Sequence, residues 1–213
     1  KANRVVRAAE GRTVLEFGSR RAQGSDAAIL GARAAYIGGC GGTACTICEK
    51  KYGIPALGTM AHSWVQLFDS EYEAFKTYAE LYPENCTLLI DTYNVLKSGI
   101  VNAIRVFNEV ILPKGFRPGG VRIDSGDITY LSKKVRKILD DAGFSDCGIV
   151  ASNSMDENII KDTLSQGAQI DSFGIGERLI TSKSEPVFGG VYKLSAVEKG
   201  GEFQPKIKIS ENV

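Results

Sequence analysis

The chain has 213 residues, which is enough for one sizeable hydrophobic core. Its 26 Lys and Arg residues nearly balance its 25 Asp and Glu residues, and a net charge of +1 gives no support for nucleic-acid binding driven by bulk charge. No apolar run approaches the ~18 residues that cross a bilayer, and the N-terminus lacks the apolar core of a signal peptide. We therefore expect a cytoplasmic protein with no nucleic-acid partner and no membrane partner.

Short apolar segments recur along the chain. The predicted strands are TVLEFGS (13–19), IPALGT (54–59), TLLIDT (87–92), GVRIDS (120–125), CGIVAS (147–152), DSFGIG (171–176) and GVYKLSAV (190–197). Their continuous Val, Ile and Leu cores are typical of parallel strands that are covered on both faces. The last residues, KIKISENV (206–213), also resemble a strand, and the chain has no initiator methionine. We expect it to be a piece of a longer protein.

Amphipathic helices are predicted between these strands. Ser70 followed by Glu73 forms a capping box for a helix over 71–81. Further helices are predicted over about 97–110, ending before Pro113; over 128–143, ending at Gly143; and after Ser154 and Glu157, ending at Gly167. Alternating strands and helices predict a parallel sheet, either a barrel or an open doubly wound sheet. Polar residues at almost every strand end favour the barrel.

These polar strand ends are EFGSRR, GTMAHSW, DTYN, RIDSGD, SNSMDE and FGIGE. For any one of them the simpler explanation is a turn, since turns are rich in Gly, Ser, Asp and Asn for backbone reasons. Six in succession make that explanation weaker for the whole set. Because the carboxyl ends of parallel strands meet at one rim, we predict a polar, anion-handling site there.

Three residues at these strand ends are candidates for the chemistry. His62 is the only histidine; a lone histidine is often structural, but here it follows a strand and is suited to acid–base catalysis or to accepting a phosphoryl group. Asp124 and Asp127 are candidates for holding hydrated Mg²⁺ or for accepting ribose hydroxyls. Asp127 is equally well explained as the cap of the helix that begins at Ile128.

Arginines and glycines at the strand ends fit the binding of an anion. Arg20 and Arg21 follow a strand directly and point in different directions, so we expect at most one of them to face the site. Arg122 is the only charge in an apolar strand, and a substrate carboxylate would satisfy it if it points inward. The segments GGCGGT (38–43) and FGIGE (173–177) can bring backbone N–H groups close to phosphate, although neither is a specific motif.

Three of the five cysteines allow a competing explanation. Cys40, Cys45 and Cys48 have the C-x4-C-x2-C spacing of a plant-type iron–sulfur protein, with two more cysteines available as a fourth ligand. The same spacing fits a helix over 43–52 that places Cys45 and Cys48 on one apolar face. We favour the helix and expect free thiols in a reducing compartment.

Taken together, EFGSRRAQG, IGGCGGTA, GTMAHSWV, LIDTYN, GGVRIDSGD, IVASNSMDE and DSFGIGERL resemble the nicotinate phosphoribosyltransferase family, in that family's order and spacing. The resemblance extends from about Arg12 to Lys193. It implies an irregular, TIM-like α/β barrel of parallel strands, with the site at the strand C-terminal ends. Residues 1–213 are then a catalytic core that is incomplete at both termini, without the family's N-terminal domain and C-terminal remainder.

The resemblance also implies an activity. Members of this family join nicotinate to 5-phosphoribosyl 1-pyrophosphate, giving nicotinate mononucleotide and pyrophosphate, and couple this reaction of NAD salvage to ATP hydrolysis. The implied partners are nicotinate, 5-phosphoribosyl 1-pyrophosphate and ATP; the implied cofactor is Mg²⁺; and the implied assembly is a homodimer with shared sites. The isolated fragment is expected to bind weakly and to turn over little.

The implied catalytic residues lie at three strand ends. His62 matches the histidine that ATP phosphorylates during the family's cycle. Asp91 and Asp124 match groups that position His62, the ribose or Mg²⁺, and Asp124 is the implied metal ligand. Met60 stands where some relatives carry a polar group, which leaves the ATP contacts open.

The implied substrate-binding residues surround them. Phe17 matches the aromatic residue that stacks on the pyridine ring, and Arg122, with Thr43 nearby, matches the contact for the nicotinate carboxylate. The others are Arg20 as a phosphate ligand, Ser125, and a cradle for the ribose and 5-phosphate made of Ser152, Asn153, Gly174 and Gly176.

Two other functions stay open on the sequence alone. A sibling enzyme would use nicotinamide, which has no charge to pair with Arg122, or quinolinate, which would require more basic residues. A catalytically silent binding or assembly domain is the alternative from a different class.

Overall fold

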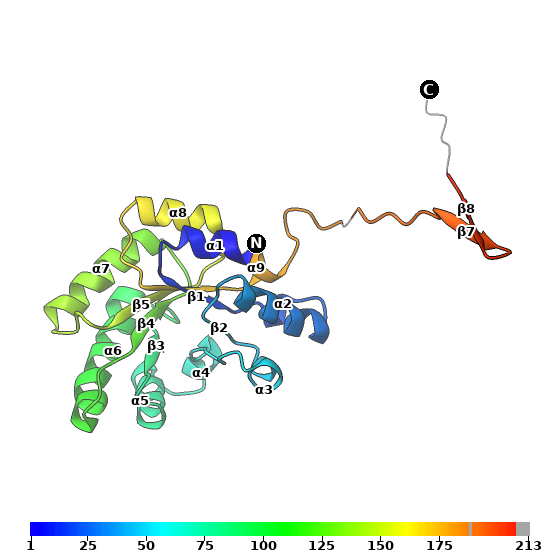
Figure 1. The fold of residues 1–213 in the computed structure, drawn as a ribbon. Helices are drawn as coiled ribbons and strands as arrows, with labels where there is room; N and C mark the ends of the chain where they lie inside the picture. The colour runs from blue at the N-terminus through cyan, green and yellow to red at the C-terminus, as the bar shows by residue number, and fades with distance from the viewer. Residues whose placement is uncertain (188, 208–213) are drawn as a thin grey trace. The chain divides into compact units, whose positions relative to one another are not determined.

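The computed structural model describes residues 1–187 and 189–207 (Figure 1). The chain divides into two compact units, Lys1–Thr181 and Ser182–Val213, and each is described by itself. The prediction that 1–213 make one catalytic core stays a prediction. The first unit contains one parallel sheet, with the strands β1 (Thr13–Glu16), β2 (Gly42–Thr43), β3 (Thr87–Leu89), β4 (Gly120–Ile123), β5 (Gly148–Ala151) and β6 (Ser172–Ile175).

The order of the strands across this sheet is β2-β1-β6-β5-β4-β3. Strands that follow one another in the chain are therefore neighbours, except β2 and β3, and the last strand, β6, pairs with the first, β1. An open doubly wound sheet would instead reverse its strand order at a switch point near the middle. The sheet is a curled parallel half-barrel that is open between β2 and β3, and all its strands end at one rim.

One of the predicted strands, over residues 54–59 at this opening, is wrong. Residues 54–59 do not form a strand; Ala56 alone makes a β-bridge, parallel to Thr43. The backbone N–H of Thr43 donates to Pro55 O at 3.0 Å, and the N–H of Leu57 donates to Thr43 O at 2.9 Å. Proline has no N–H to donate, so the ladder is not continued on the other side of this segment.

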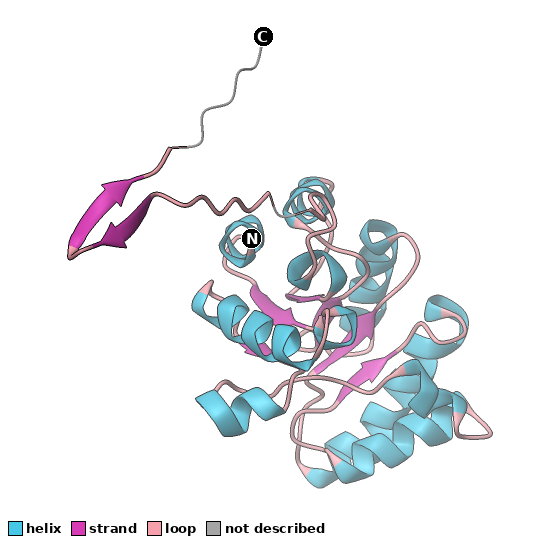
Figure 2. Ribbon diagram, turned by 90° about the vertical axis from the view of Figure 1, so that its right-hand side faces the viewer, coloured by secondary structure: helices cyan, strands magenta, loops and turns pink. Residues whose placement is uncertain are grey.

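The helices pack in a belt that follows the order of the strands: α2 on α1, α1 on α8, α8 on α7, α7 on α6, α6 on α5 and α5 on α4 (Figures 1 and 2). Between belt and sheet lies the main hydrophobic core, which includes the fully buried Leu88, Ile123, Ile149 and Phe173. The helices are α1 (Ala2–Ala8), α2 (Ser25–Ile37), α3 (Ile47–Tyr52), α4 (His62–Gln66), α5 (Glu71–Leu81), α6 (Ile100–Val106), α7 (Ile128–Asp141), α8 (Glu157–Ser165) and α9 (Glu177–Ile180).

Two of the predicted helix starts are confirmed by their caps. The Ser70 hydroxyl accepts a hydrogen bond from the N–H of Glu73 at 3.2 Å, where α5 begins. The Asp127 carboxylate accepts one from the N–H of Tyr130 at 2.9 Å, where α7 begins. Asp127 is therefore accounted for as a helix cap.

A third predicted cap is wrong. Asp156, not Ser154, precedes α8, and its carboxylate accepts hydrogen bonds from the N–H groups of Asn158 and Ile159. Asp156 has the extended backbone that a cap requires, whereas Ser154 lies two residues earlier with a positive φ of 41°. The helix closes before Gly167, as predicted.

The helix predicted over 97–110 is longer and less regular than expected. A Cβ on Gly99 would lie 1.9 Å from the carbonyl oxygen of Ile90, so only glycine lets the chain pass this strand end. The helical region starts with a π-helical turn that directly follows the DTYN segment. Such turns occur often at functional sites. The irregular pieces around α6 are η2 (Val95–Gly99) and η3 (Phe107–Ile111), both π-helical, and η4 (Leu112–Lys114), a 3₁₀ turn that includes Pro113.

The second unit is an antiparallel hairpin of β7 (Ala196–Lys199) and β8 (Glu202–Pro205). Gly200 and Gly201, with φ of 62° and 85°, form its turn. The strand predicted over 190–197 is misplaced: it begins at Ala196, because that residue pairs with Pro205, the last residue of β8. The strand predicted at the C-terminus falls largely on 208–213, outside the described residues. No helix in the described part of the chain is long and apolar enough to cross a membrane.

Candidate functional site

Two adjoining cavities open at the carboxyl ends of the strands. The first has a volume of about 420 Å³ and the second of about 250 Å³. Four residues, Phe17, Arg20, Arg122 and Asp124, line both cavities and so form a shared wall. The first cavity adds His62 and the loop 58–61, and the second adds the segment 152–155, Gly174, Gly176, Glu177 and Arg178. Predicted site residues from β1, β4, β5 and β6 thus meet at one place.

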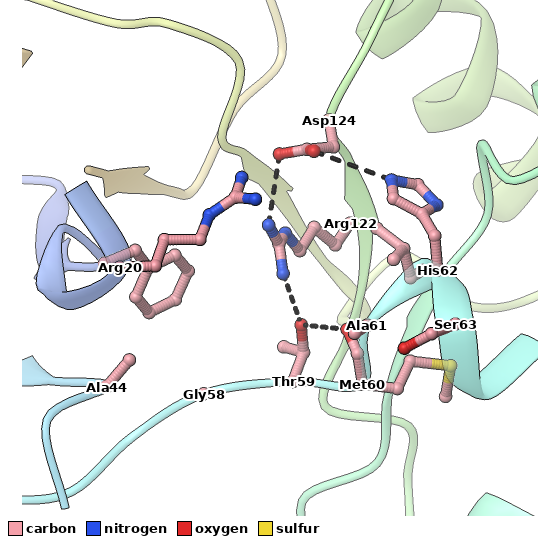
Figure 3. Close-up of a pocket in the computed structure, with 12 residues that line it drawn as sticks. Arg20, Ala44, Gly58, Thr59, Met60, Ala61, His62, Ser63, Arg122 and Asp124 are labelled. Carbon is pink, nitrogen blue, oxygen red and sulfur yellow. Dashed lines mark hydrogen bonds and ion pairs between the residues drawn. The ribbon is translucent and has the colours of Figure 1, made fainter. Parts of the chain in front are cut away.

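Arg122 is the centre of the shared wall. In β4 it alternates with the buried Val121 and Ile123, so its side chain lies on the opposite face of the sheet. Each of its three nitrogens donates to a side chain. Nε donates to Ser152 Oγ at 2.7 Å. Nη1 donates to Thr59 Oγ1 at 2.9 Å and Nη2 to Asp124 Oδ1 at 3.0 Å (Figure 3). The guanidinium is therefore held in a fixed orientation by groups that follow β4 and β5 and by the loop 58–61.

Phe17 lies directly after β1, and its ring centroid is 5.3 Å from the Arg122 guanidinium carbon. A Cβ on Gly174 would lie 2.4 Å from Phe17 Cε2, and a Cβ on Gly176 would lie 2.9 Å from Phe17 O. These two glycines are thus required for the close approach of Phe17 to β6. Both also line the second cavity, and their role as a phosphate cradle stays a prediction.

His62 faces two carboxylates. Its Nδ1 lies 3.1 Å from Thr92 Oγ1, while Nε2 lies 3.5 Å from Asp124 Oδ2 and 3.9 Å from Asp91 Oδ1. The imidazole is 40% exposed, so a ligand can reach it, whereas the Asp91 side chain is 1% exposed. The ring is therefore oriented at the rim by groups from β3 and β4.

The Asp91 carboxylate is only half satisfied. Its Oδ2 accepts hydrogen bonds from the backbone N–H of Asp124 at 3.1 Å and from the Ser125 hydroxyl. Its Oδ1 is buried without a hydrogen-bond partner among the described residues. A buried acceptor of this kind calls for a ligand or a cation. Asp91 Oδ1 and Asp124 Oδ2 both face His62 Nε2, and two carboxylates are a usual protein contribution to Mg²⁺ that also binds substrate phosphates.

Arg20 has no hydrogen-bond or ion-pair partner within residues 1–187 and 189–207. Arg20 belongs to the 3₁₀ turn η1 (Ser19–Arg21). Figure 3 shows its guanidinium extending toward the Arg122 guanidinium and the Asp124 carboxylate. Arg21 also lines the second cavity and pairs with Glu177 at 3.7 Å. The prediction that at most one of the two arginines faces the site is therefore wrong, because the 3₁₀ turn brings both to the rim.

The second cavity has a further cation. Arg178 lines it and donates through Nη1 to the Asp156 carboxylate. Burial alone would raise the pKa of Asp156, but the hydrogen bonds from Ile159 N–H and from Arg178 outweigh it and hold the pKa below its usual value. Asp156 therefore fixes Arg178 as well as the start of α8. Four arginines, Arg20, Arg21, Arg122 and Arg178, surround a space that also has glycine and serine in its walls.

Some predicted site residues lie outside both cavities. Thr43 is fully buried, and its hydroxyl donates to Glu16 Oε2. Ser125 and Asp91 stand behind Asp124 rather than in the cavity walls. Thr59 and Thr92, which orient Arg122 and His62, are not among the predicted site residues. Both lie in the polar segments GTMAHSW and DTYN, but nothing in the sequence distinguishes them from ordinary turn residues.

The cysteines are all buried and free. Cys40 belongs to the main core, whereas Cys45 and Cys48 pack with Ala32 and Ile54 in a separate small cluster. Burial raises the pKa of Cys40 and of Cys48 to about 11. Among the residues that the structure describes, no group of three or more His, Cys, Asp or Glu side chains is arranged to hold a metal ion. The packing of the thiols is that of small apolar side chains.

The fold and the rim together define an α/β half-barrel with a cation-lined site at its strand ends. The model of the nicotinate phosphoribosyltransferase (NAPRTase) family matches residues 13–210, and the chain belongs to this family. It is 48% identical over 212 residues to nicotinate phosphoribosyltransferase of Bacillus subtilis (strain 168), covering all of this chain and 43% of that protein. It is 45% identical over 201 residues to nicotinate phosphoribosyltransferase pncB2 of Mycobacterium tuberculosis (strain CDC 1551 / Oshkosh), covering 94% of this chain and 42% of that protein.

Solved structures agree with this assignment. The crystal structure of human nicotinic acid phosphoribosyltransferase matches with a TM-score of 0.76 and 26% identity, over 82% of this chain and 46% of that one. The crystal structure of nicotinate-nucleotide pyrophosphorylase from Pyrococcus furiosus matches with a TM-score of 0.71 and 27% identity, over 84% of this chain and 45% of that one. The chain thus spans less than half the length of these relatives.

Proposed function

We propose that the protein containing this chain is a nicotinate phosphoribosyltransferase of NAD salvage. It would join nicotinate to 5-phosphoribosyl 1-pyrophosphate, giving nicotinate mononucleotide and pyrophosphate, with coupled hydrolysis of ATP. The observation that supports this most directly is the wall shared by the two cavities, because it offers an aromatic ring and an oriented guanidinium beside a space lined by arginines and glycines. A flat anionic ring and a phosphorylated sugar that react with each other need such adjoining subsites.

Nicotinate would bind in the first cavity. Its pyridine ring would stack on Phe17, and its carboxylate would take the place of Asp124 or Thr59 as a partner of Arg122. This exchange is feasible because both present partners are side chains, which can turn away without disturbing the sheet. Nicotinamide, which lacks the negative charge, would leave Arg122 with its present partners.

The ribosyl donor would bind toward the second cavity. Arg20 is without a partner and lines both cavities, so it suits a phosphate that lies near the reacting carbon. Arg21 and Arg178, with the backbone around Gly174 and Gly176, would hold the 5-phosphate. Ribosyl transfer passes through an oxocarbenium-like state, and the carboxylate of Asp124 would stabilise its positive charge.

His62 would accept the phosphoryl group of ATP. Asp91 and Asp124 keep its ring oriented at the rim and would stabilise an imidazolium cation. A phosphate on His62 would add negative charge beside these carboxylates and reshape the site, which is one way for ATP to favour product. Asp91 Oδ1 and Asp124 Oδ2 would hold Mg²⁺, which when bound would neutralise the charge of the pyrophosphate leaving group.

The complete protein would supply what this half-barrel lacks. We propose that the rest of the chain closes the opening between β2 and β3 into an irregular TIM-like barrel. We also propose a cytoplasmic homodimer in which the partner subunit completes each site. Exposed large apolar side chains on the first unit, among them Leu30, Ile37 and Leu67, are consistent with surfaces that further protein covers.

The test is an assay of the full-length protein with nicotinate, 5-phosphoribosyl 1-pyrophosphate, Mg²⁺ and ATP labelled in its γ-phosphate. Nicotinate mononucleotide should form, and label should appear on His62 during turnover. Competition binding provides the second arm: nicotinate should bind more tightly than nicotinamide. Tighter binding of nicotinamide or quinolinate would reject the proposed substrate, and an ATP-dependent label on a His62→Ala variant would reject the phosphohistidine.

A further inference from the structure

Glu16, at the end of β1, has an unusual environment for a carboxylate. Glu16 is 0% exposed, and in the described part of the chain it and Glu71 are the charged residues that are buried as whole residues, backbone included. It forms no ion pair with any lysine, arginine or histidine that the structure describes. A buried carboxylate without a cation is costly unless each oxygen receives a hydrogen bond.

Both Glu16 oxygens receive one, from two different strand ends. Oε1 accepts the backbone N–H of Gly18, and Oε2 accepts the Thr43 hydroxyl at 2.5 Å. Thr43 Oγ1 in turn accepts the backbone N–H of Cys45 at 2.9 Å. A single side chain therefore ties the turn after β1 to the turn after β2, below the rim and out of contact with solvent.

These two turns carry walls of the first cavity. Phe17 and Arg20 flank Gly18 and belong to the wall that both cavities share, and Ala44 lies between Thr43 and Cys45 and lines the first cavity. A Cβ at Gly18 would lie 2.6 Å from Ile180 Cγ2 and 2.8 Å from Glu16 Oε1, so a side chain at this position would clash with both residues. The spacing of Phe17 and Ala44 across the first cavity thus depends on the Glu16 carboxylate.

We propose that Glu16 is a positioning residue for the ring-binding cavity, which it shapes from beneath without touching substrate. Through Gly18 it orients Phe17 and Arg20, and through Thr43 it holds the Ala44 wall. This inference deepens the proposed function and rests on it. The role of Thr43 is then to hold Glu16, since the Thr43 hydroxyl donates to Glu16 and the side chain lines neither cavity.

The chemistry demands a carboxylate rather than an amide. Both partners, the Gly18 N–H and the Thr43 O–H, are donors, so both Glu16 oxygens must accept. Glutamine has the same shape but only one oxygen, so its NH₂ group either faces the Gly18 N–H donor or faces Thr43, whose hydroxyl must then accept instead of donating. Glu16→Gln therefore removes the Gly18 tie or replaces the charge-assisted bond from Thr43 with a weaker neutral one, at nearly constant volume.

The experiment uses the full-length protein, first as wild type, with kcat and KM for nicotinate measured alongside thermal unfolding. Formation of nicotinate mononucleotide by the wild type establishes the reaction independently of Glu16; its absence would be a failure of the proposed function instead. The variants are Glu16→Gln, Thr43→Val, which removes the hydroxyl at similar volume, and Thr43→Ser, which keeps it. Glu71→Gln is the matched control, a buried glutamate outside both cavities.

We expect Glu16→Gln and Thr43→Val to lower kcat/KM for nicotinate about 10- to 100-fold, the size of effect that a small misplacement of binding groups produces. Thr43→Ser should retain most of the activity, Glu71→Gln should match wild type in kcat/KM, and the double variant Glu16→Gln/Thr43→Val should lose little more than either single one. If Glu16→Gln does not fold, the Thr43→Val and Thr43→Ser pair decides the question. Values of kcat/KM within about threefold of wild type for both Glu16→Gln and Thr43→Val, or equal losses in Thr43→Val and Thr43→Ser, would overturn the positioning role.

Discussion

The two ends of the half-barrel both have arginines and a cavity, but the arginines are used differently. At the amino end, Arg12 Nε donates to Ile170 O at 2.8 Å. Arg136 donates from Nη1 to Cys147 O and from Nη2 to Phe144 O, both at 2.7 Å. At the carboxyl end, Arg122 donates only to side chains, and Arg20 has no partner in the part of the chain that the structure describes.

The size of a cavity does not separate the two ends. The cavity at the amino end, lined among others by Arg12, Arg136 and Asp171, has a volume of about 510 Å³, more than either cavity at the carboxyl end. The difference is in what the cations contact. An arginine that satisfies main-chain carbonyls cannot leave them without stranding buried acceptors, whereas one held by side chains or by nothing can accept a ligand. We infer that the carboxyl end is built to bind anions and the amino end to hold the chain together.

The largest effect that would test this division is expected at His62. Replacing it with alanine removes the only imidazole at the carboxyl end, and we expect kcat/KM in the presence of ATP to fall about 10²- to 10⁴-fold. Thermal unfolding should change little, because the ring is 40% exposed. The measurement is steady-state kinetics of the full-length protein with and without ATP. Full ATP coupling in the variant would contradict the role assigned to His62.

Arg20→Gln addresses the unpartnered arginine. We expect KM for 5-phosphoribosyl 1-pyrophosphate to rise about 10- to 100-fold, since a hydrogen bond to a charged group contributes roughly 1.5–3 kcal/mol. The melting temperature should stay at the wild-type value, because no intramolecular bond is lost. A drop in melting temperature without a change in KM would show that Arg20 is structural and would break the comparison.

Arg136→Gln is the matched change at the amino end. It strands the carbonyl oxygens of Cys147 and Phe144, and Arg136 is only 17% exposed, so we expect unfolding to become easier by about 2–4 kcal/mol. Values of kcat/KM should remain within about twofold of wild type. Chemical denaturation of the full-length protein measures the first and kinetics the second. A large loss of activity at unchanged stability would mean that the amino end also takes part in function.

The smallest expected effect concerns Glu71, a buried charge that lies at neither cavity. Burial raises its pKa, partly offset by hydrogen bonds from Asn102 and Ser98. The folded state therefore binds the proton more tightly than the unfolded state, and this contribution to stability is present below the ordinary value of 4.5 and lost as pH rises through the raised pKa. Glu71→Gln lacks this titration. The stability of this variant relative to wild type, followed by denaturation as a function of pH, should be highest near neutrality and should decline on acidification. A difference that does not vary with pH would contradict the raised pKa.

Much of the fold could be predicted from local patterns. β1, β3, β4, β5 and β6 lie where apolar runs predicted them, and α5 and α7 begin at the predicted caps. The helices α1 and α2 were not predicted, because their buried faces are made largely of alanine and show a weak apolar stripe. Residues 54–59 have the composition of a strand, but a strand also needs partners to pair with. Ala56 bridges only to Thr43, and Pro55 has no N–H to donate to a second neighbouring strand.

The inventory of the site can be read from the chain alone: an imidazole, carboxylates, arginines and glycines at successive strand ends, which a parallel sheet brings to one rim. How these groups are paired depends on the folded arrangement. It saturates Arg122 and leaves Arg20 open, assigns Gly174 to the ring of Phe17, and buries Glu16 between two turns. The physical reason is that residue type and chain order act locally, whereas many of these hydrogen-bond partners, such as Thr59 and Ser152 for Arg122 and Thr43 for Glu16, lie tens of residues apart in sequence and meet only when the sheet curls.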